Sequence, residues 1–316
     1  MANFIDLSNI TYCGKEAQEI MSRDVYSMDL RNAGVTFMDN VKGKMKIYSG
    51  EIGEAWQLYT CPFTPAGEAS LAEAFIEPAA IKVNQENCYD TFWNTFLVEQ
   101  TEISLRGGIP QTFGVWYFGK LREKMAREYQ EIFWQGDTTR TATTKSYLKA
   151  TDGIEKKLGA LGTANTVTVT AFTVDNILAQ VEASIKKALD LAAAGEYSTD
   201  NLKVLMNYSD VQLLKMALGK ICCPNSESIF SNYAKGPDGG VIIYGIPVIS
   251  TVQSRNTIIV GDPRNLVLGY DTFDSHIEYK LIDMRETTGD NMFRVLAISN
   301  IAVGIIFPES FVFGKV

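Results

Sequence analysis

The hydrophobic and polar positions of the chain follow helical spacing first and strand-like spacing later. Three stretches carry apolar side chains at positions i, i+3, i+4 and i+7, which predicts amphipathic helices. These helices extend from Tyr89 to before Gly107, over about 115–134, and over 174–194. Gly136 is expected to stop the second helix, while Thr173 and Gly195 are expected to cap and stop the third.

From Val241 onward, β-branched runs alternate with Gly, Pro, Asn and Asp, a pattern typical of short strands. The predicted strands are 241–244, 246–249, 257–260, 266–268, 277–284 and 295–306. An earlier apolar run at 203–207 predicts a buried strand that leads at Ser209 into a short helix. Long helices before a β-rich final third predict a mixed α+β fold.

The stretch 47–81 differs from the rest because it contains five glutamates and no lysine or arginine. The glutamates are Glu51, Glu54, Glu68, Glu73 and Glu77. Short alternations such as 56–59, bounded by proline and glycine, predict an extended two-stranded projection with a large loop. Such a projection has little core of its own, so we expect it to be functional or to pack on another subunit.

Composition and charge limit the function classes. The 316 residues carry 29 basic and 37 acidic side chains, for a net charge of -8 and a pI near 4.9. This balance argues against a dedicated nucleic-acid binder, because such proteins neutralise phosphates with clustered lysine and arginine. The charge is uneven: it is -7 over 1–113, +3 over 114–160 and -4 over 161–316.

The sequence offers little support for catalysis, a metal or another cofactor. His276 is the single histidine, and the fragment from His276 to Glu278 matches part of a zinc deaminase motif without the cysteines that complete it. The five cysteines are an odd number and form no C-x-x-C. They are Cys13, Cys61, Cys88, Cys222 and Cys223. We therefore expect no disulfide framework, no cofactor and no catalytic residues, and we interpret Cys222 and Cys223 as small buried apolar residues.

Neither a secretory leader nor a membrane span is expected. No basic residue precedes Lys15, and no apolar core of leader length follows the first methionine. The longest apolar stretch, 295–307, is interrupted by polar residues and glycine and is shorter than the ~20 residues that a span needs. We expect a soluble protein of a reducing compartment.

Several short motifs resemble, in order, segments of the major capsid proteins of tailed bacteriophages, the HK97-like family. Each motif is weak alone, and their order and spacing over roughly 40–312 carry the resemblance. They are Trp134-Gln135-Gly136-Asp137, the segment 149–154, the segment 204–207, the segment 244–249, the segment 259–266, and the closing runs 293–295 and 304–308.

The resemblance implies an HK97-like fold with an N-terminal arm, an extended E-loop, a P-domain with a long spine helix, and an A-domain. The implied division is an arm at 1–42, the E-loop at 43–87, the P-domain at 88–165 and 271–316, and the A-domain at 166–270, with the spine helix at about 115–134. In this family the arm and the E-loop reach onto neighbouring subunits.

The charge distribution gives a hypothesis for one such contact. Opposite charges across an interface steer its register more than they add affinity. We hypothesise that the glutamates of 47–81 face basic residues of the helix 115–134 in a neighbour. The basic candidates are Lys120, Arg122, Lys124 and Arg127. The alternative is that all these charges are solvated and keep the monomer soluble, since most surface pairs contribute only ~0 to 1 kcal/mol.

The resemblance implies a structural protein that self-assembles into the pentamers and hexamers of an icosahedral phage head around double-stranded DNA. Its expected partners are further copies of itself, portal and scaffolding proteins and a decoration protein, with no sequence-specific DNA contact and no membrane. It would assemble in the host cytoplasm and reside in the virion. The alternatives are an encapsulin-like nanocompartment shell that packages a cargo enzyme and, more remotely, a carboxylate-based hydrolase.

Overall fold

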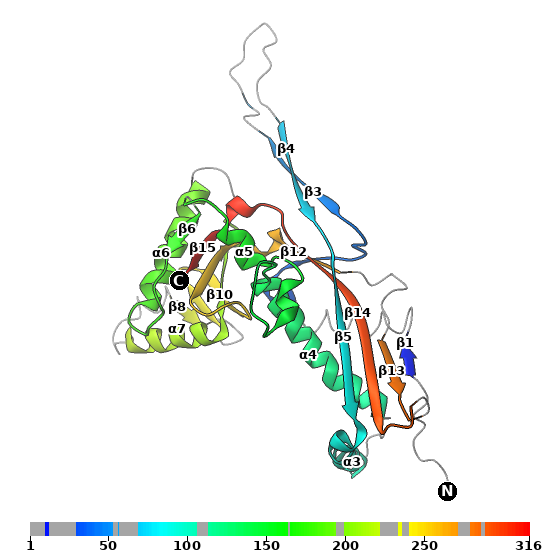
Figure 1. Cartoon of the computed structure of the whole chain (residues 1–316). Coiled ribbons are helices and arrows are strands. Elements are labelled where there is room, and N and C mark those ends of the chain that lie inside the picture. Colours follow the sequence, from blue (N-terminus) through cyan, green and yellow to red (C-terminus); the bar gives the residue numbers. More distant parts are fainter. Residues whose placement is uncertain are drawn as a thin grey trace.

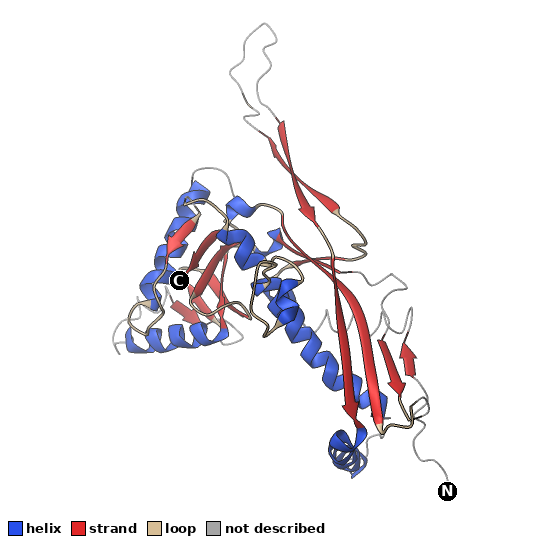
Figure 2. Ribbon diagram, in the orientation of Figure 1, coloured by secondary structure: helices blue, strands red, loops and turns tan. Residues whose placement is uncertain are grey.

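The computed structural model arranges the chain around two β-sheets, with a hairpin that projects away from both (Figure 1). The structure describes residues 10–12, 30–52, 56, 69–105, 113–163, 165–193, 199–221, 233–235, 240–270, 279–285 and 288–316. Helices and strands alternate along this part of the chain (Figure 2), which confirms the predicted mixed α+β fold.

The first sheet is built on β14 (Met292–Ile305), a strand of 14 residues. One edge of β14 pairs antiparallel with β5 (Ala79–Cys88). The other edge pairs antiparallel with β13 (Tyr279–Asp283) and, further along, with β12 (Leu266–Tyr270). The sheet is completed by β1 (Ile10–Tyr12) beside β13 and by β2 (Thr36–Met38) beside β12. Strands from both ends of the sequence therefore lie in the same sheet.

The second sheet has seven strands and forms a separate lobe with two helices. Its order is β6 (Thr166–Thr168), β15 (Val312–Lys315), β11 (Thr257–Gly261), β7 (Lys203–Asn207), β10 (Ile246–Thr251), β9 (Val241–Ile243) and β8 (Tyr233–Lys235). Two neighbouring pairs in this order are parallel, β7 with β10 and β6 with β15. The other four pairs are antiparallel.

The central strands of the second sheet are buried on both faces. On β7, Val204 and Met206 face one side, where they pack with α6 (Ile177–Ala193) and α7 (Tyr208–Ile221). Leu205 faces the other side and joins a core shared with the first sheet. A strand buried on both faces reads as a continuous apolar run, which is why 203–207 is recognisable in the sequence.

Helix α4 (Phe113–Gln135) lies along the first sheet (Figure 1) and contributes to two hydrophobic cores. Its first half packs in an aromatic core with α3 (Tyr89–Leu105) and the start of β14. Its second half packs against the end of β14 and against the second sheet. Near its middle, the Tyr129 hydroxyl is hydrogen-bonded to Ser299 and donates to the carbonyl oxygen of Asn300. The helix is thus fixed to β14 along its length.

The remaining short elements close the connections. They are α2 (Leu30–Ala33), α5 (Ile154–Gly159), and the 3-10 turns at Ser146–Lys149, Pro263–Asn265 and Pro308–Ser310. Leu30 and Ala33 of α2 are buried in the shared core, so this part of the predicted arm packs on its own subunit.

The structure confirms most predicted elements within a few residues and corrects two starts. The strand predicted over 295–306 begins earlier, at Met292. The helix predicted from Val174 begins regularly at Ile177. The Asn176 side chain accepts a hydrogen bond from the backbone N–H of Thr173 and donates one to the carbonyl oxygen of Ala171. These bonds hold the preceding residues in a non-helical turn. Gly195, the expected stop, lies outside the described residues.

Two strands pair outside the domain to which the sequence interpretation assigns them. β12 belongs to the predicted A-domain range 166–270 but pairs with β14 and β2 in the first sheet. β15 belongs to the predicted P-domain range 271–316 but pairs with β11 and β6 in the second sheet. The division into domains remains a prediction, and these pairings show that the chain crosses between the sheets at 261–266 and again at 305–312.

Candidate functional site

The projecting hairpin is the most distinctive surface feature of the molecule (Figure 1). All eight residues of β3 (Met45–Ile52) pair antiparallel with the eight residues of β4 (Ala69–Ile76). This confirms the two-stranded projection predicted for 47–81. Because side chains alternate along a strand, Ile47 and Ile76 share the face that packs on the first sheet, whereas Lys46 and Phe75 lie on the other face.

The outer face of the hairpin is polar and aromatic. Lys46 Nζ lies 2.8 Å from Glu73 Oε2 across the two strands. Lys44 Nζ and Lys46 Nζ lie 4.5 and 5.6 Å from the centroid of the Phe75 ring, within cation–π range. Phe75 is 44% exposed, and Trp56, between the two strands in sequence, is 93% exposed. Large exposed aromatic side chains are typical of contact surfaces.

The five predicted acidic contact residues have different positions. Glu73 lies on β4 and is already paired with Lys46, while Glu77 is exposed just after β4. Glu51 lies on β3, and its side chain is not among those that the structure describes. Glu54 and Glu68 lie outside the described residues. Glu73 and Glu77 are therefore the two whose side chains can be placed, and both are exposed at the hairpin.

The predicted basic residues lie on α4, where Lys120, Lys124 and Arg127 pair with acidic residues of the same subunit. Lys120 Nζ is 3.2 Å from Glu99 Oε1 on α3. Lys124 and Arg127 each pair one helical turn along, with Glu128 and Glu131. The Lys120, Lys124 and Arg127 side chains are more than half exposed, and Arg122 is half-buried.

Within one subunit the described strands of the hairpin, β3 and β4, point away from α4 (Figure 1). The acidic partners of Lys120, Lys124 and Arg127 described above lie on α3 and α4. The hypothesised contact therefore needs a second copy of the chain. In such a contact, the hairpin glutamates of the neighbour would compete for Lys120, Lys124 and Arg127 with the ion pairs inside the subunit. Exposed pairs of this kind contribute only ~0 to 1 kcal/mol each.

A charged corner follows α4. Asp137 and Asp152 belong to the motifs 134–137 and 149–154, whereas Lys156 is not among the residues that the sequence analysis names. Lys156 Nζ lies 2.7 Å from Asp137 Oδ1 and 2.8 Å from Asp152 Oδ1. Hydrogen bonds that Lys156 and, to a lesser extent, Thr139 donate to the Asp137 carboxylate lower its pKa to about 2. Asp152 and Lys156 are four residues apart, a spacing that a sequence shows, whereas Asp137 lies 19 residues from Lys156 and no periodic pattern links these two.

A buried glutamate strengthens the same corner. Glu131 Oε2 accepts hydrogen bonds from Lys145 Nζ at 2.8 Å and from the Tyr147 hydroxyl at 2.5 Å. Burial raises the pKa of Glu131, but these donors outweigh burial and hold the pKa below its ordinary value. Burial and the neighbouring Glu131 raise the pKa of Tyr147. The corner is a network of paired charges that positions the chain after α4.

Two glycines allow the corner to close. The Gly153 N–H donates to the Gly136 carbonyl oxygen at 2.8 Å. A Cβ on Gly136 would lie 2.6 Å from the Ile132 carbonyl oxygen and closer still to that of Thr151, and a Cβ on Gly153 would lie 2.6 Å from the Gly136 nitrogen. Side chains are therefore excluded at both positions. This explains why glycine occurs in both of the neighbouring motifs, 134–137 and 149–154, that carry the family resemblance.

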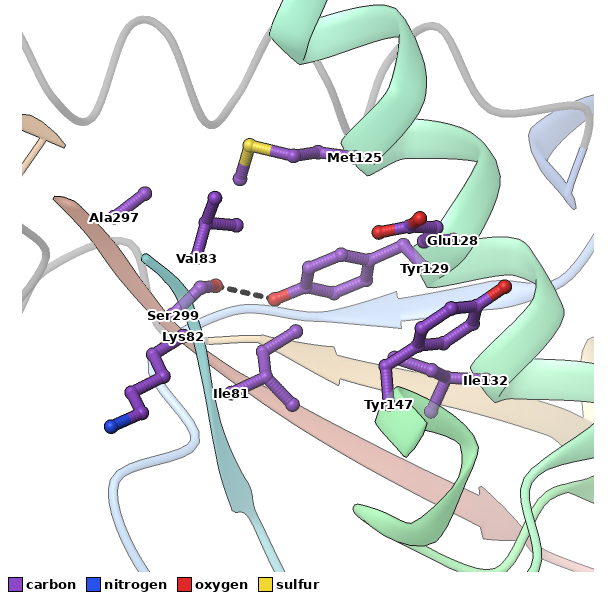
Figure 3. A pocket seen from close by; sticks show the side chains of 10 residues that line it. All are labelled: Ile81, Lys82, Val83, Met125, Glu128, Tyr129, Ile132, Tyr147, Ala297 and Ser299. Carbon is purple, nitrogen blue, oxygen red and sulfur yellow. Dashed lines mark hydrogen bonds between the residues drawn. The ribbon is translucent and has the colours of Figure 1, made fainter. Parts of the chain in front are cut away.

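A small cavity lies between α4 and the first sheet (Figure 3). Its volume is about 50 Å³, and aliphatic side chains of Ile81, Val83, Met125 and Ile132 line much of it. The Tyr129 hydroxyl and Ser299 are hydrogen-bonded to each other at one wall. A space of this size holds one or two water molecules. We interpret it as a packing gap beneath the helix.

The remaining chemical candidates cannot be placed or do not form a site. His276, Cys222 and Cys223 lie outside the described residues. No group of three potential metal ligands occurs among the residues that the structure describes. In the same part of the chain, no helix is both long and apolar enough to cross a membrane.

Comparison with known proteins identifies the fold. No protein-family model and no curated protein matches the sequence. Solved structures do match. The chain is similar to one from the procapsid of satellite phage P4 with its size determination (Sid) protein, at 13% identity and a TM-score of 0.60, covering 98% of this chain and 93% of that chain.

Two further similarities are to Gordonia phage Cozz and to the capsid of an empty GTA particle. The identities are 13% and 12%, both TM-scores are 0.51, and each match covers 91% of this chain. The matches cover 85% and 89% of those chains. At these identities the similarity establishes the fold, which is the HK97-like fold of phage capsid proteins. The predicted fold is thereby confirmed.

Proposed function

We propose that this chain is a major capsid subunit that self-assembles into the pentamers and hexamers of an icosahedral phage head enclosing double-stranded DNA. The observation that carries the proposal is the similarity to a phage procapsid chain over 98% of the sequence. The projecting hairpin supports it independently, because only its base packs on the first sheet, and a two-stranded hairpin without a core of its own is stabilised by contact with another molecule.

The elements take the roles that the family resemblance assigns to them. The hairpin β3–β4 is the E-loop, α4 is the spine helix of the P-domain, and the lobe of the second sheet with α6 and α7 is the A-domain. We assign β12 to the P-domain and β15 to the A-domain because of their strand pairing. Residues 1–42 form the N-terminal arm.

The hairpin of one subunit lies over its neighbour in this proposal. Glutamates Glu51, Glu54, Glu68, Glu73 and Glu77 then face Lys120, Arg122, Lys124 and Arg127 of that neighbour. The further partners are portal, scaffolding and decoration proteins, and the DNA is enclosed without sequence-specific contact. Assembly takes place in the host cytoplasm, the product is the virion shell, and no step of catalysis is required.

Sedimentation of the purified full chain tests the proposal. We expect particles of megadalton mass, with nuclease-protected double-stranded DNA in those recovered from infected or induced cells. Shells that contain a protein cargo and no DNA would instead support the encapsulin-like alternative. Small oligomers alone, under several assembly conditions, would contradict both shell proposals and leave the hydrolase alternative.

A further inference from the structure

A patch of small residues lies on the first sheet beneath the projecting hairpin. Gly269 of β12 lies opposite Ala302 of β14, and Val267 lies opposite Gly304. Since residues two apart on a strand share a face, these four residues form one patch on one face of the sheet. Two of the four have no side chain and one has a single methyl group, which leaves a depression between Val267 and its neighbours.

Two aliphatic side chains fill this depression, one from each connection of the hairpin. Ile76 is the last residue of β4, and it is 1% exposed. Val41 lies in the segment between β2 and β3, and it is completely buried. The Val41 N–H also donates to the carbonyl oxygen of Tyr270 at 3.2 Å, which ties that segment to β12. The hairpin is therefore held where it leaves the sheet and where it returns.

The fit depends on the absence of side chains at the two glycines. A Cβ on Gly304 would lie 2.6 Å from Cγ1 and 2.8 Å from Cδ1 of Ile76. A Cβ on Gly269 would lie 2.9 Å from Cγ2 of Val41 and 3.1 Å from Cβ of Ala302. Ile76 has little freedom to turn away, because Val41, Val267 and Ala302 surround it in one buried cluster.

The need for glycine here is a need for space. Neither Gly269 nor Gly304 has the positive φ that disfavours other residues, and both lie within regular strands. Alanine is therefore compatible with the backbone at both positions. Gly43, just before β3, also lacks a positive φ, and a Cβ added there would meet no atom within 4 Å beyond its chain neighbours. Gly43 therefore provides a matched control near the same hairpin.

We infer that Gly269 and Gly304 form a socket for Val41 and Ile76 that sets the direction in which the hairpin leaves the sheet, and through it the geometry of subunit contacts. The second part of this inference rests on the proposed capsid function. A hairpin eight residues long per strand extends about 26 Å, so a small change of angle at its base displaces the far end by several ångströms.

The first test uses unassembled protein and measures the distance between spin labels at Glu73 on the hairpin and Lys149 beyond α4. Genetically encoded labels avoid the native cysteines. Gly304→Ala is expected to shift or broaden the distance distribution, whereas Gly43→Ala leaves it unchanged. Adding Ile76→Ala to Gly304→Ala removes the clashing atoms and is expected to restore the wild-type distribution.

A Gly304→Ala distribution identical to wild type would overturn the socket, as would a shift that Ile76→Ala does not reverse. If Gly304→Ala fails to fold, Gly269→Ala, whose closest approach is the longer 2.9 Å, replaces it with Val41→Ala as the compensating change.

The second test compares assembled particles by electron microscopy. Gly304→Ala is expected to change particle size or lower shell yield, and the double variant with Ile76→Ala is expected to recover the wild-type size. Normal shells from Gly304→Ala with a shifted hairpin would overturn the link to assembly. Failure of the wild type itself to form shells would refute the proposed function, whereas the label distances would still decide whether the socket exists.

Discussion

The individual residues described above contribute through their size and their charge, which decide how closely other parts of the chain pack against them. Gly136 illustrates the point. The sequence predicts it as a helix stop, which it is, since its N–H still donates to the Ile132 carbonyl oxygen at 3.0 Å. The structure adds that no side chain fits there, because Gly153 and Thr151 pack against it. A sequence shows that a glycine is present, but it does not show which distant backbone approaches it.

Asp137 provides a prediction at the residue scale. Its pKa is lowered to about 2 in the folded protein, chiefly by Lys156, against an ordinary value near 4 in the unfolded chain. A carboxyl group whose pKa is lower in the folded state stabilises the fold at pH values above its pKa in the unfolded chain. This stabilisation is lost as the pH falls through its pKa in the folded protein. Asp137→Asn should therefore lower the unfolding midpoint by up to a few degrees at pH 7, and the difference should shrink between pH 4 and pH 2.

Thermal unfolding monitored by circular dichroism at several pH values checks this prediction. Asp175→Asn is the matched control, since Asp175 also pairs with a lysine, Lys220, but its side chain is 84% exposed. The control should have little effect at any pH. A difference between wild type and Asp137→Asn that is constant from pH 7 to pH 2 would contradict the assigned role of the Asp137 carboxylate.

At the scale of elements, the sequence predicts those with a strong period and misses those whose existence depends on a distant partner. α4 shows the first case, because its apolar stripe contacts β14 along the whole helix. β1 and β2 show the second case: each has three residues, and each is a strand only because β13 or β12 lies beside it. Such short segments have no period to detect.

The hairpin as a candidate site was also predictable in outline. Its strands are predicted by short alternations of apolar and polar residues that are bounded by proline and glycine. Its acidic character is predicted by the five glutamates of 47–81. The contact between Ile76 and Gly304 was not predictable, because 228 positions separate the two residues and no periodic pattern links them. The pairing of Glu73 with Lys46 was likewise hidden until the register of β3 and β4 was known.

Charge reversal on the hairpin gives a prediction at the element scale. Changing Glu51, Glu54 and Glu68 to lysine should slow assembly roughly several-fold at 0.01 M salt, where charges act over ~30 Å. The effect should largely disappear at 1 M salt, where screening shortens that range to ~3 Å. Light scattering during assembly measures both rates.

The control reverses Asp175, Asp190 and Asp290, which are exposed and lie away from the hairpin, and so gives the same net charge. It should assemble at nearly the wild-type rate. Equal slowing of both triple variants would mean that net charge matters and the proposed pairing does not. Unchanged assembly of the hairpin variant at low salt would remove the hypothesis of a contact with Lys120, Arg122, Lys124 and Arg127.

At the scale of the whole molecule, two sheets share one core that α4 helps to form. The chain crosses between them three times, after β5, after β11 and after β14, and the last two crossings place β12 in the first sheet and β15 in the second. The sequence could not make this assignment, because buried strands of the two sheets, such as β11 and β12, read as the same kind of continuous apolar run. Leu205 and Ile259 of one sheet and Leu266 and Ile301 of the other meet in this core, so the two lobes are not independent.

The central claim is that this chain builds a closed shell in which each hairpin lies over a neighbour. Electron cryomicroscopy of assembled wild-type particles tests it most directly. The account predicts an icosahedral shell in which density for β3 and β4 of one subunit crosses the P-domain of the next. Small oligomers alone, or a shell in which the hairpin contacts no other subunit, would contradict it.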